Sequence, residues 1–172
     1  GKRRWFDYYK TMVGVSVHEQ CFQQKYYPFI QTVRAMIKPG ATVLEMGCGT
    51  ALVTKLLSDA PARFMVSDFD CAMMFLARMN LRPLPVKLSF HDIRQPIMDP
   101  VDIIHSHGVL EHFNKNEICT IIKAQLKRTT YLAHYVPSNK YITKSFGDEL
   151  LMSKEAWQYL VHPSKIVEFN EG

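Results

Sequence analysis

From residue 41 onward, short apolar runs alternate with segments whose apolar residues recur every three or four positions. The short runs predict strands, and the longer periodic segments predict amphipathic helices. The expected strands are Thr42–Met46, Arg63–Asp68, Val86–His91, Asp102–Ser106, Thr130–Val136 and Lys165–Phe169. Because helical segments lie between them, the pattern is typical of a three-layer α/β sandwich, in which a mostly parallel sheet carries helices on both faces.

Local end signals place two of the helices. Pro28 is favourable in a first helical turn, and Pro39-Gly40 ends the same helix after Lys38. Ser153 is a good N-cap for a short helix that runs to Val161. Between the fifth strand and this helix, residues 137–152 show no clear periodicity. A stretch of that length in a compact protein is often functional, so we expect a substrate loop there.

The length favours one domain. A chain of 172 residues with 47% hydrophobic residues can bury one ordinary core, and no repeat or low-complexity linker divides it. We therefore expect residues 1–172 to form a single domain. Residues 1–27 are aromatic and amphipathic, and they are expected to cap the sheet or to act as a lid over a ligand.

The net charge and the cysteine spacing limit which partners and which metal or disulfide sites are expected. The formal net charge of +5 permits nucleic acid as a partner without requiring it. The four cysteines are widely spaced and form no C-x-x-C pair, so neither a zinc site nor a disulfide framework is expected. No apolar run reaches the ~20 residues of a membrane span. We expect a cytoplasmic protein without membrane contact, and nothing indicates its oligomeric state.

The strand at 42–46 runs directly into a glycine pair, Gly47-Cys48-Gly49, and then into a helix. Glycines allow a sharp turn and the close approach of a ligand to main-chain atoms. In open α/β sheets, ligands bind at the carboxyl ends of the strands. A dinucleotide loop would need a third glycine where Leu52 stands, and Glu45 suits a cationic amino group better than a pyrophosphate. Asp68, which ends the second strand, can bind ribose hydroxyls whether the ligand is a dinucleotide or a nucleoside that carries a cationic amino group.

Glu45-Met46-Gly47-Cys48-Gly49-Thr50 resembles the first motif of the class I S-adenosylmethionine-dependent methyltransferases, a Rossmann-like family. Val66 to Asp70 and His91-Asp92-Ile93 resemble its second and third motifs, and Val101 to Phe113 resembles its fourth; the similarity covers roughly residues 28–136. It implies that Asp68 holds the ribose, Asp92 contacts the adenine amino group and Ile93 contacts the adenine ring. The expected contacts of S-adenosylmethionine, and of its product S-adenosylhomocysteine, are Glu45, Gly47, Cys48, Gly49, Thr50, Asp68, Phe69, Asp92, Ile93, His107 and Tyr9.

The sequence departs from the family pattern at two places. Ala51 stands at the third small position of the first motif and is slightly bulkier than glycine. The family usually ends its sheet with an antiparallel hairpin of a sixth and a seventh strand. This sequence offers one candidate for that hairpin, Lys165–Phe169.

Histidines around the fourth strand are the candidates for chemistry. Methyl transfer needs an acceptor held in line with the methyl group in a dry site, and a base helps where the acceptor must lose a proton. His107 and His112 are expected near the methyl group and are the predicted catalytic residues; alternatively, His105 is packed in the core and His112 simply opens a helix. His105, His107 and Glu111 or His112 could alternatively bind a metal, but no further ligands are evident and no metal is expected.

The acceptor class follows from motifs that the sequence lacks. The fourth strand is followed by His105-Ser106-His107-Gly108, where exocyclic-amine nucleic-acid methyltransferases carry an Asn/Asp-Pro-Pro-aromatic motif. A Pro-Cys nucleophile and a double-glutamate loop are also missing. We therefore expect methyl transfer to an oxygen or nitrogen atom of a small-molecule acceptor. The alternatives are an RNA or protein methyltransferase and a cofactor-binding module without catalysis. Tyr9 is the N-terminal aromatic residue expected on the cofactor side, if that segment is a lid.

Overall fold

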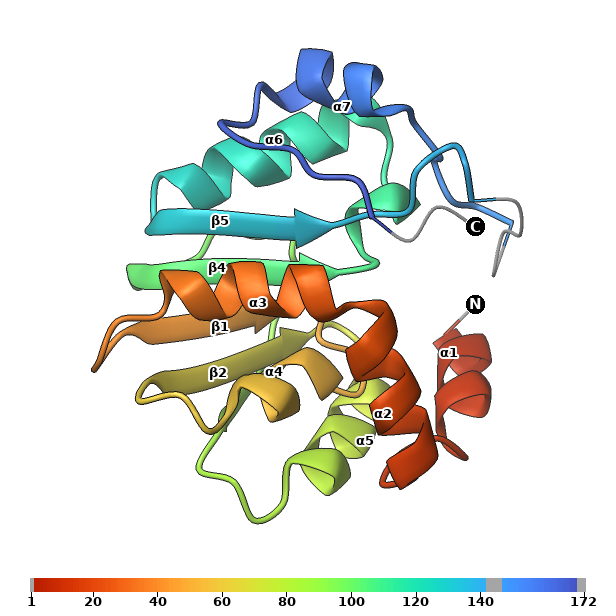
Figure 1. Cartoon of the computed structure of the whole chain (residues 1–172), viewed down its shortest axis with the longest axis vertical. Coiled ribbons are helices and arrows are strands. Elements are labelled where there is room, and N and C mark those ends of the chain that lie inside the picture. The colour runs from red at the N-terminus through yellow and green to blue at the C-terminus, as the bar shows by residue number, and fades with distance from the viewer. Residues whose placement is uncertain (1, 142–146, 170–172) are drawn as a thin grey trace.

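A parallel five-stranded sheet forms the centre of the computed structural model, which describes residues 2–141 and 147–169 (Figure 1). Its strand order is β3-β2-β1-β4-β5. The strands are β1 (Thr42–Met46), β2 (Arg63–Asp68), β3 (Lys87–Phe90), β4 (Val101–His107) and β5 (Thr129–Tyr135). Because β2 and β4 lie on opposite sides of β1, the strand order reverses there, and a ligand crevice is expected at the carboxyl ends of β1 and β4.

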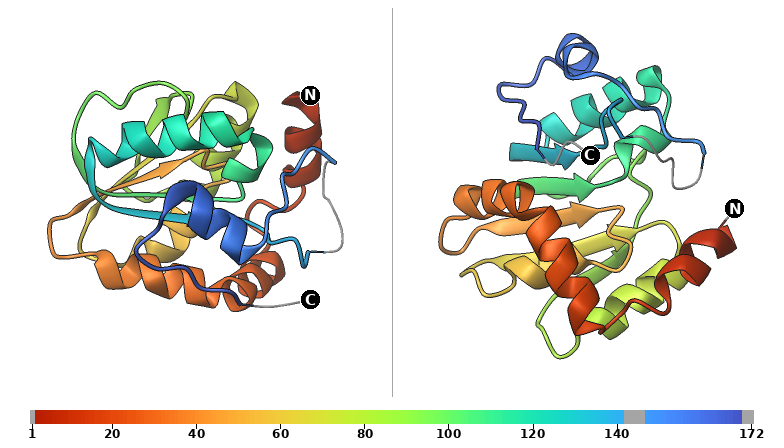
Figure 2. Two further views of the ribbon diagram at one scale, coloured as in Figure 1. Left: turned by 90° about the horizontal axis from the view of Figure 1, so that it is seen from above. Right: turned by 45° about the vertical axis from the view of Figure 1, so that its right-hand side comes forward.

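Helices cover both faces of the sheet (Figures 1 and 2). One face carries α3 (Tyr27–Met36), α4 (Leu52–Leu57) and α5 (Cys71–Leu81), and the other carries α6 (Lys115–Leu126) and α7 (Lys154–Val161). Alternate strand residues serve the two layers: Val43 packs with α3 and α4, whereas Leu44 packs with α6. The three-layer, Rossmann-like α/β fold expected from the sequence is confirmed.

Two further helices lie at the N-terminal end. α2 (Ser16–Lys25) leads through Tyr26 directly into α3. α1 (Lys2–Tyr9) lies beyond the arrowheads of the strands, at the edge of the sheet where their carboxyl ends gather (Figure 1). It contacts α5 on one side, and Trp5 reaches a short 3-10 helix, η1 (Leu110–His112), on the other. The N-terminal segment therefore spans this edge, as either a cap or a lid would.

Most predicted elements are found within one or two residues of their expected ends. β1 and β2 have the predicted bounds, α3 is shifted by one or two residues, and the Ser153 side chain caps α7 by accepting a hydrogen bond from the Ala156 N–H. That residues 1–172 form one domain stays a prediction. Within residues 137–152, residues 142–146 lie outside the described part of the chain.

The strand predicted at Lys165–Phe169 is wrong. These residues form no strand and pair with no neighbouring strand. Ile166 packs against the cluster under α6 and α7, whereas Phe169 packs against the cluster under α3 and contacts the Tyr135 ring at 5.7 Å. The segment thus crosses the β5 edge of the sheet and places its apolar side chains in two different layers.

Candidate functional site

The glycine loop joins β1 to α4 at the centre of the carboxyl edge. Gly47 and Gly49 both have positive φ, at 63° and 55°, so the loop depends on conformations that other residues rarely adopt. A Cβ built on Gly47 would lie 2.8 Å from the Val109 side chain, so the loop after β4 packs directly against the glycine loop. The Cys48 N–H donates to the Ser67 carbonyl at 2.9 Å and ties the loop to β2.

Asp68 lies beside this loop, as its motif predicts. It is buried at the end of β2, and its carboxylate accepts hydrogen bonds from the Gly49 N–H at 3.0 Å and the Asp70 N–H at 2.9 Å. Burial raises the pKa of Asp68, and the two backbone donors oppose that rise. Phe69 follows with its side chain partly exposed. A carboxylate and an aromatic ring therefore stand next to the glycine loop, where ribose and adenine are expected.

Glu45 is held beneath the loop. One carboxylate oxygen accepts from both the backbone N–H and the hydroxyl of Thr54, at 3.1 and 2.5 Å, in the first turn of α4. Burial raises the pKa of Glu45 to about 7, and the Thr54 bonds oppose the rise. Its expected contact with an amino group stays a prediction.

Cys48 and Thr50 contribute to the loop in different ways. Burial raises the pKa of the Cys48 thiol well above its usual value, which excludes a thiolate nucleophile at neutral pH. The Thr50 carbonyl accepts from the Asn80 side chain at 2.8 Å, which fixes the loop to α5. The cofactor contacts expected of Cys48 and Thr50 stay predictions.

Asp92 and Ile93 follow β3, next to the end of β2. The His91 N–H donates to the Asp68 carbonyl at 3.0 Å, so the two strand ends are joined. Arg94 forms an ion pair with Asp92 at 2.6 Å and lowers the pKa of that carboxyl. Ile93 is buried in the core. The adenine contacts expected of both residues stay predictions.

His107 lies in an aromatic cluster rather than at an open surface. Its ring stacks on Tyr135 at 4.4 Å and meets the edge of Tyr26 at 4.2 Å, with Phe22 at 5.0 Å and Phe29 at 5.7 Å. Burial lowers the pKa of His107 to about 3, so the ring is neutral. Nε2 is buried without a hydrogen-bond partner among the described residues. This packing favours a structural role, and the predicted catalytic role remains untested.

Three segments converge around η1. The His112 ring meets the edge of Trp5 from α1 at 5.2 Å, and its Nδ1 lies 3.1 Å from an Asp148 carboxylate oxygen. The Leu150 N–H donates to the Glu111 carbonyl at 2.6 Å. Tyr9 stacks against Trp5 at 6.1 Å, and burial raises its pKa. α1, η1 and residues 147–150 therefore contact one another near the end of β4.

Glu111 also lies in this region, although its sequence position predicted at most a metal ligand. It is 4% exposed, and its Oε2 atom has no hydrogen-bond partner in the described chain. Burial raises the pKa of Glu111 to about 8, and Glu149 and Asp148 add to the rise. The sequence does contain a signal for a functional role, because Glu111 is the one acidic residue in the apolar and histidine-rich run from 105 to 113. Across residues 2–141 and 147–169, no three His, Cys, Asp or Glu residues are grouped so that they could hold a metal ion.

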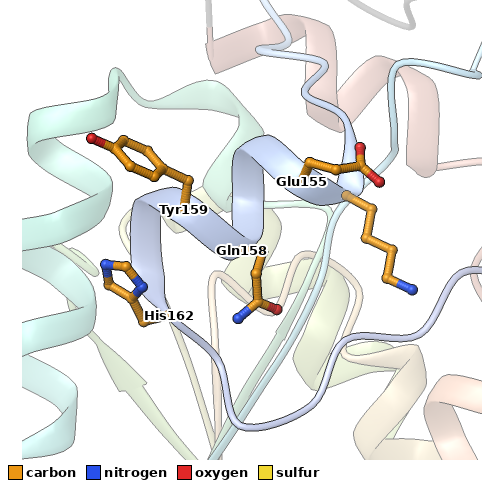
Figure 3. A pocket seen from close by; sticks show the side chains of 5 residues that line it. Glu155, Gln158, Tyr159 and His162 are labelled. Carbon is orange, nitrogen blue, oxygen red and sulfur yellow. The ribbon is translucent and has the colours of Figure 1, made fainter.

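A hollow of about 380 Å³ lies elsewhere, on the outer side of α7 (Figure 3). Glu155, Gln158, Tyr159 and His162 line it, and Tyr159 is 82% exposed. The hollow is open and contains none of the motif residues. A helix long and apolar enough to span a membrane is absent from the described residues.

The region that carries the motifs matches a known protein family. Residues 43–129, half of the chain, match the model of a family described as a methyltransferase domain. The malonyl-[acyl-carrier protein] O-methyltransferase of Anoxybacillus flavithermus is 29% identical over 101 residues, which are 56% of this chain and 39% of that protein. This chain thus spans about two fifths of the length of that relative.

Solved structures share the fold. The PH0226 protein of Pyrococcus horikoshii OT3 superposes with a TM-score of 0.71 at 17% identity, covering 91% of this chain and 88% of that one. DhpI in complex with S-adenosylhomocysteine gives a TM-score of 0.70 at 16% identity, covering 92% and 82%. With the matched family model and the glycine loop at the end of β1, these results establish that the chain belongs to the class I S-adenosylmethionine-dependent methyltransferases.

Proposed function

We propose that this chain transfers a methyl group from S-adenosylmethionine to an oxygen or nitrogen atom of a small-molecule acceptor. The observation that carries the proposal is the grouping of the glycine loop, Asp68 and Asp92 at the carboxyl ends of three adjacent strands, within the segment that matches the methyltransferase family.

The residues present fit the cofactor. Gly47 and Gly49 adopt positive φ and let the loop turn sharply at the end of β1, and the Asp68 carboxylate suits the hydroxyls of a ribose. Asp92 can accept from an adenine amino group once Arg94 yields, and Phe69 offers an aromatic surface beside it. When bound, S-adenosylmethionine supplies a methyl group on a positively charged sulfur.

The chain's own residues position the acceptor and exclude water. α1 lies over the carboxyl edge, and residues 147–150 are bonded to η1, so both can shield the space at the end of β4. Catalysis of methyl transfer rests largely on holding the two reactants in line in a dry site. The acceptor is accordingly expected next to η1, on the side of the glycine loop where Val109 packs.

A small acceptor is favoured by the motifs that the sequence lacks. The relative from Anoxybacillus acts, by its name, on an acyl group carried by a protein, so a carrier-bound acceptor is the main alternative. RNA is the other, because the net charge is +5.

Two measurements test this function. S-adenosylhomocysteine should raise the melting temperature whereas NAD should not, because only a ligand of the native state stabilises it. Labelled methyl groups should then pass from S-adenosylmethionine to a metabolite fraction freed of macromolecules and treated with nuclease, with weak dependence on salt. Activity that requires RNA and falls steeply with salt would overturn the small-acceptor assignment. Cofactor binding without any methyl transfer would favour a non-catalytic module.

A further inference from the structure

Glu111 has a buried carboxyl oxygen that no described residue contacts through a hydrogen bond. The residue is 4% exposed, and among the described residues Oε2 has neither a hydrogen bond nor an ion pair. A buried carboxyl group normally pairs with a donor or a cation, because an unpaired one costs a large share of its hydration energy. Since no donor among residues 2–141 and 147–169 fills this place, a ligand can supply the partner.

The groups around Glu111 define what that partner is. Glu149 is buried, and Asp148 reaches the same region beside His112; both act on Glu111 as like charges. Trp5 lies against His112, and Tyr9 stacks on Trp5 close enough to Glu111 for their charges to interact. Three carboxyl groups next to two aromatic rings attract a cation, through charge and through the ring faces.

The position of Glu111 connects this cluster of acidic and aromatic side chains with methyl transfer. Glu111 lies three residues beyond Gly108, and a Cβ on Gly108 would be 3.4 Å from its Oε1 atom. Gly108 follows β4, whose carboxyl end adjoins the glycine loop through Val109. A larger residue at position 108 would crowd the carboxyl group.

We propose that Glu111 binds the amino group of the methyl acceptor, so that the acceptor atom is the nitrogen of a small primary or secondary amine. The inference rests on the function proposed above and narrows it from oxygen or nitrogen to nitrogen. The amine arrives as an ammonium ion, Glu111 releases its own proton to solvent, and the resulting carboxylate pairs with the cation, which Trp5 and Tyr9 cover from α1.

The proton balance gives Glu111 a second role. An ammonium nitrogen has no free electron pair, so one N–H proton first passes to the Glu111 carboxylate. The nitrogen pair then forms the bond to the methyl carbon while the electrons of the carbon–sulfur bond stay on sulfur, which leaves S-adenosylhomocysteine, a methylated ammonium and a neutral Glu111 carboxyl group. That the pKa of Glu111 is raised to about 8 suits it to take this proton near neutral pH.

The same charges disfavour an anionic acceptor. A malonyl group carries a carboxylate at the position to be methylated, and it would meet the like charges of Asp148 and Glu149. We therefore expect the acceptor of this chain to differ from that of the Anoxybacillus relative.

Binding tests the pocket without turnover. With the full chain saturated with S-adenosylhomocysteine, benzylamine should bind at least about tenfold more tightly than benzyl alcohol, which has the same shape without the charge. Glu111→Gln should remove this preference and leave S-adenosylhomocysteine affinity unchanged. Glu155→Gln, an exposed glutamate on α7, is the matched control and should retain it. If Glu111→Gln does not fold, carbon-13 NMR of the wild-type Glu111 carboxyl group should show its pKa falling when benzylamine binds.

Activity with two acceptor pools separates the two proposals. Methyl transfer to a pool of amines and not to a pool of alcohols and carboxylic acids is the expected result. Transfer to alcohols or acids alone would keep the proposed function and overturn the amine assignment. An equal preference for benzylamine in Glu111→Gln and wild type, or a loss of S-adenosylhomocysteine affinity in that variant, would show that Glu111 does not hold the acceptor.

Discussion

Replacing Gly47 by alanine places a methyl group where the structure has no room for one. The new Cβ would lie 2.8 and 2.9 Å from the two methyl groups of Val109, and the backbone at this position has a φ of +63°. Gly49 provides a matched control. Its φ is +55°, but a Cβ there would meet only the Met73 methyl group at 3.7 Å, which is an ordinary contact.

The two substitutions therefore differ by the clash alone. A left-handed conformation costs an L-residue about 1–2 kcal/mol, and an overpacked methyl group adds about 1–3 kcal/mol. Gly47→Ala should lower the free energy of unfolding by about 2–5 kcal/mol, whereas Gly49→Ala should lower it by about 1–2 kcal/mol. Val109→Ala removes both clashing methyl groups and leaves the Val109 Cβ at 3.5 Å, so in its presence Gly47→Ala should cost no more than Gly49→Ala.

Urea unfolding of the four proteins of this double-mutant cycle, with Gly49→Ala as a fifth, measures these terms. A coupling energy of about 1–3 kcal/mol between positions 47 and 109 is expected. Additive effects, together with equal costs at positions 47 and 49, would refute the direct packing of the loop after β4 on the glycine loop. That result would also remove the contact that connects the cofactor side of the site to η1.

Three other predictions follow from side chains of the site and the core. Asp68→Ala should weaken S-adenosylhomocysteine binding at least about tenfold in calorimetry, since charge-assisted hydrogen bonds are lost, whereas exposed Asp59→Ala should not change it. Acid unfolding, followed by circular dichroism, should become steep below about pH 5, because burial holds the pKa values of three histidines near 3 to 4. The stabilisation from these neutral histidines is complete above their unfolded pKa of about 6.5 and is lost as the pH falls through the folded values. Buried carboxyl groups whose pKa is raised offset part of that loss near pH 5. These histidines are His105, His107 and His134. Asn114→Ala should cost about 1 kcal/mol in thermal unfolding, because Asn114 and Glu117 form the capping box of α6; no change would show that the cap is not populated.

The sheet could be predicted because its inner strands are buried on both faces. β1 and β2 are short apolar runs flanked by turn residues, and the structure gives them the predicted bounds. The strand wrongly predicted at 165–169 is not buried on both faces in this way. It is rich in apolar residues, but apolar content records only which side chains are covered, and here Ile166 and Phe169 are covered by different layers without any backbone pairing.

The cofactor side of the site was predictable for a related reason. Glycines with positive φ and acids at strand ends are local requirements, so the glycine loop and Asp68 could be placed from their own short segments. His107 shows the limit, because its environment comes from rings far away in the sequence, those of Phe22, Tyr26 and Tyr135. Only the fold decides whether such a histidine faces a substrate or fills a core.

The two sides of the site should therefore respond differently to substitution. Backbone geometry defines the cofactor side, and Val109 supports it from the loop after β4. Side chains from α1, η1 and residues 147–150 define the proposed acceptor side, and their charges need not match the cofactor. Because Glu111 Oε2 has no partner among the described residues, changing the charge of Glu111 should alter the proposed acceptor side while the loop at Gly47 keeps its conformation. Acceptor preference can accordingly change through a few side chains on one fold, and family membership by itself does not determine the acceptor.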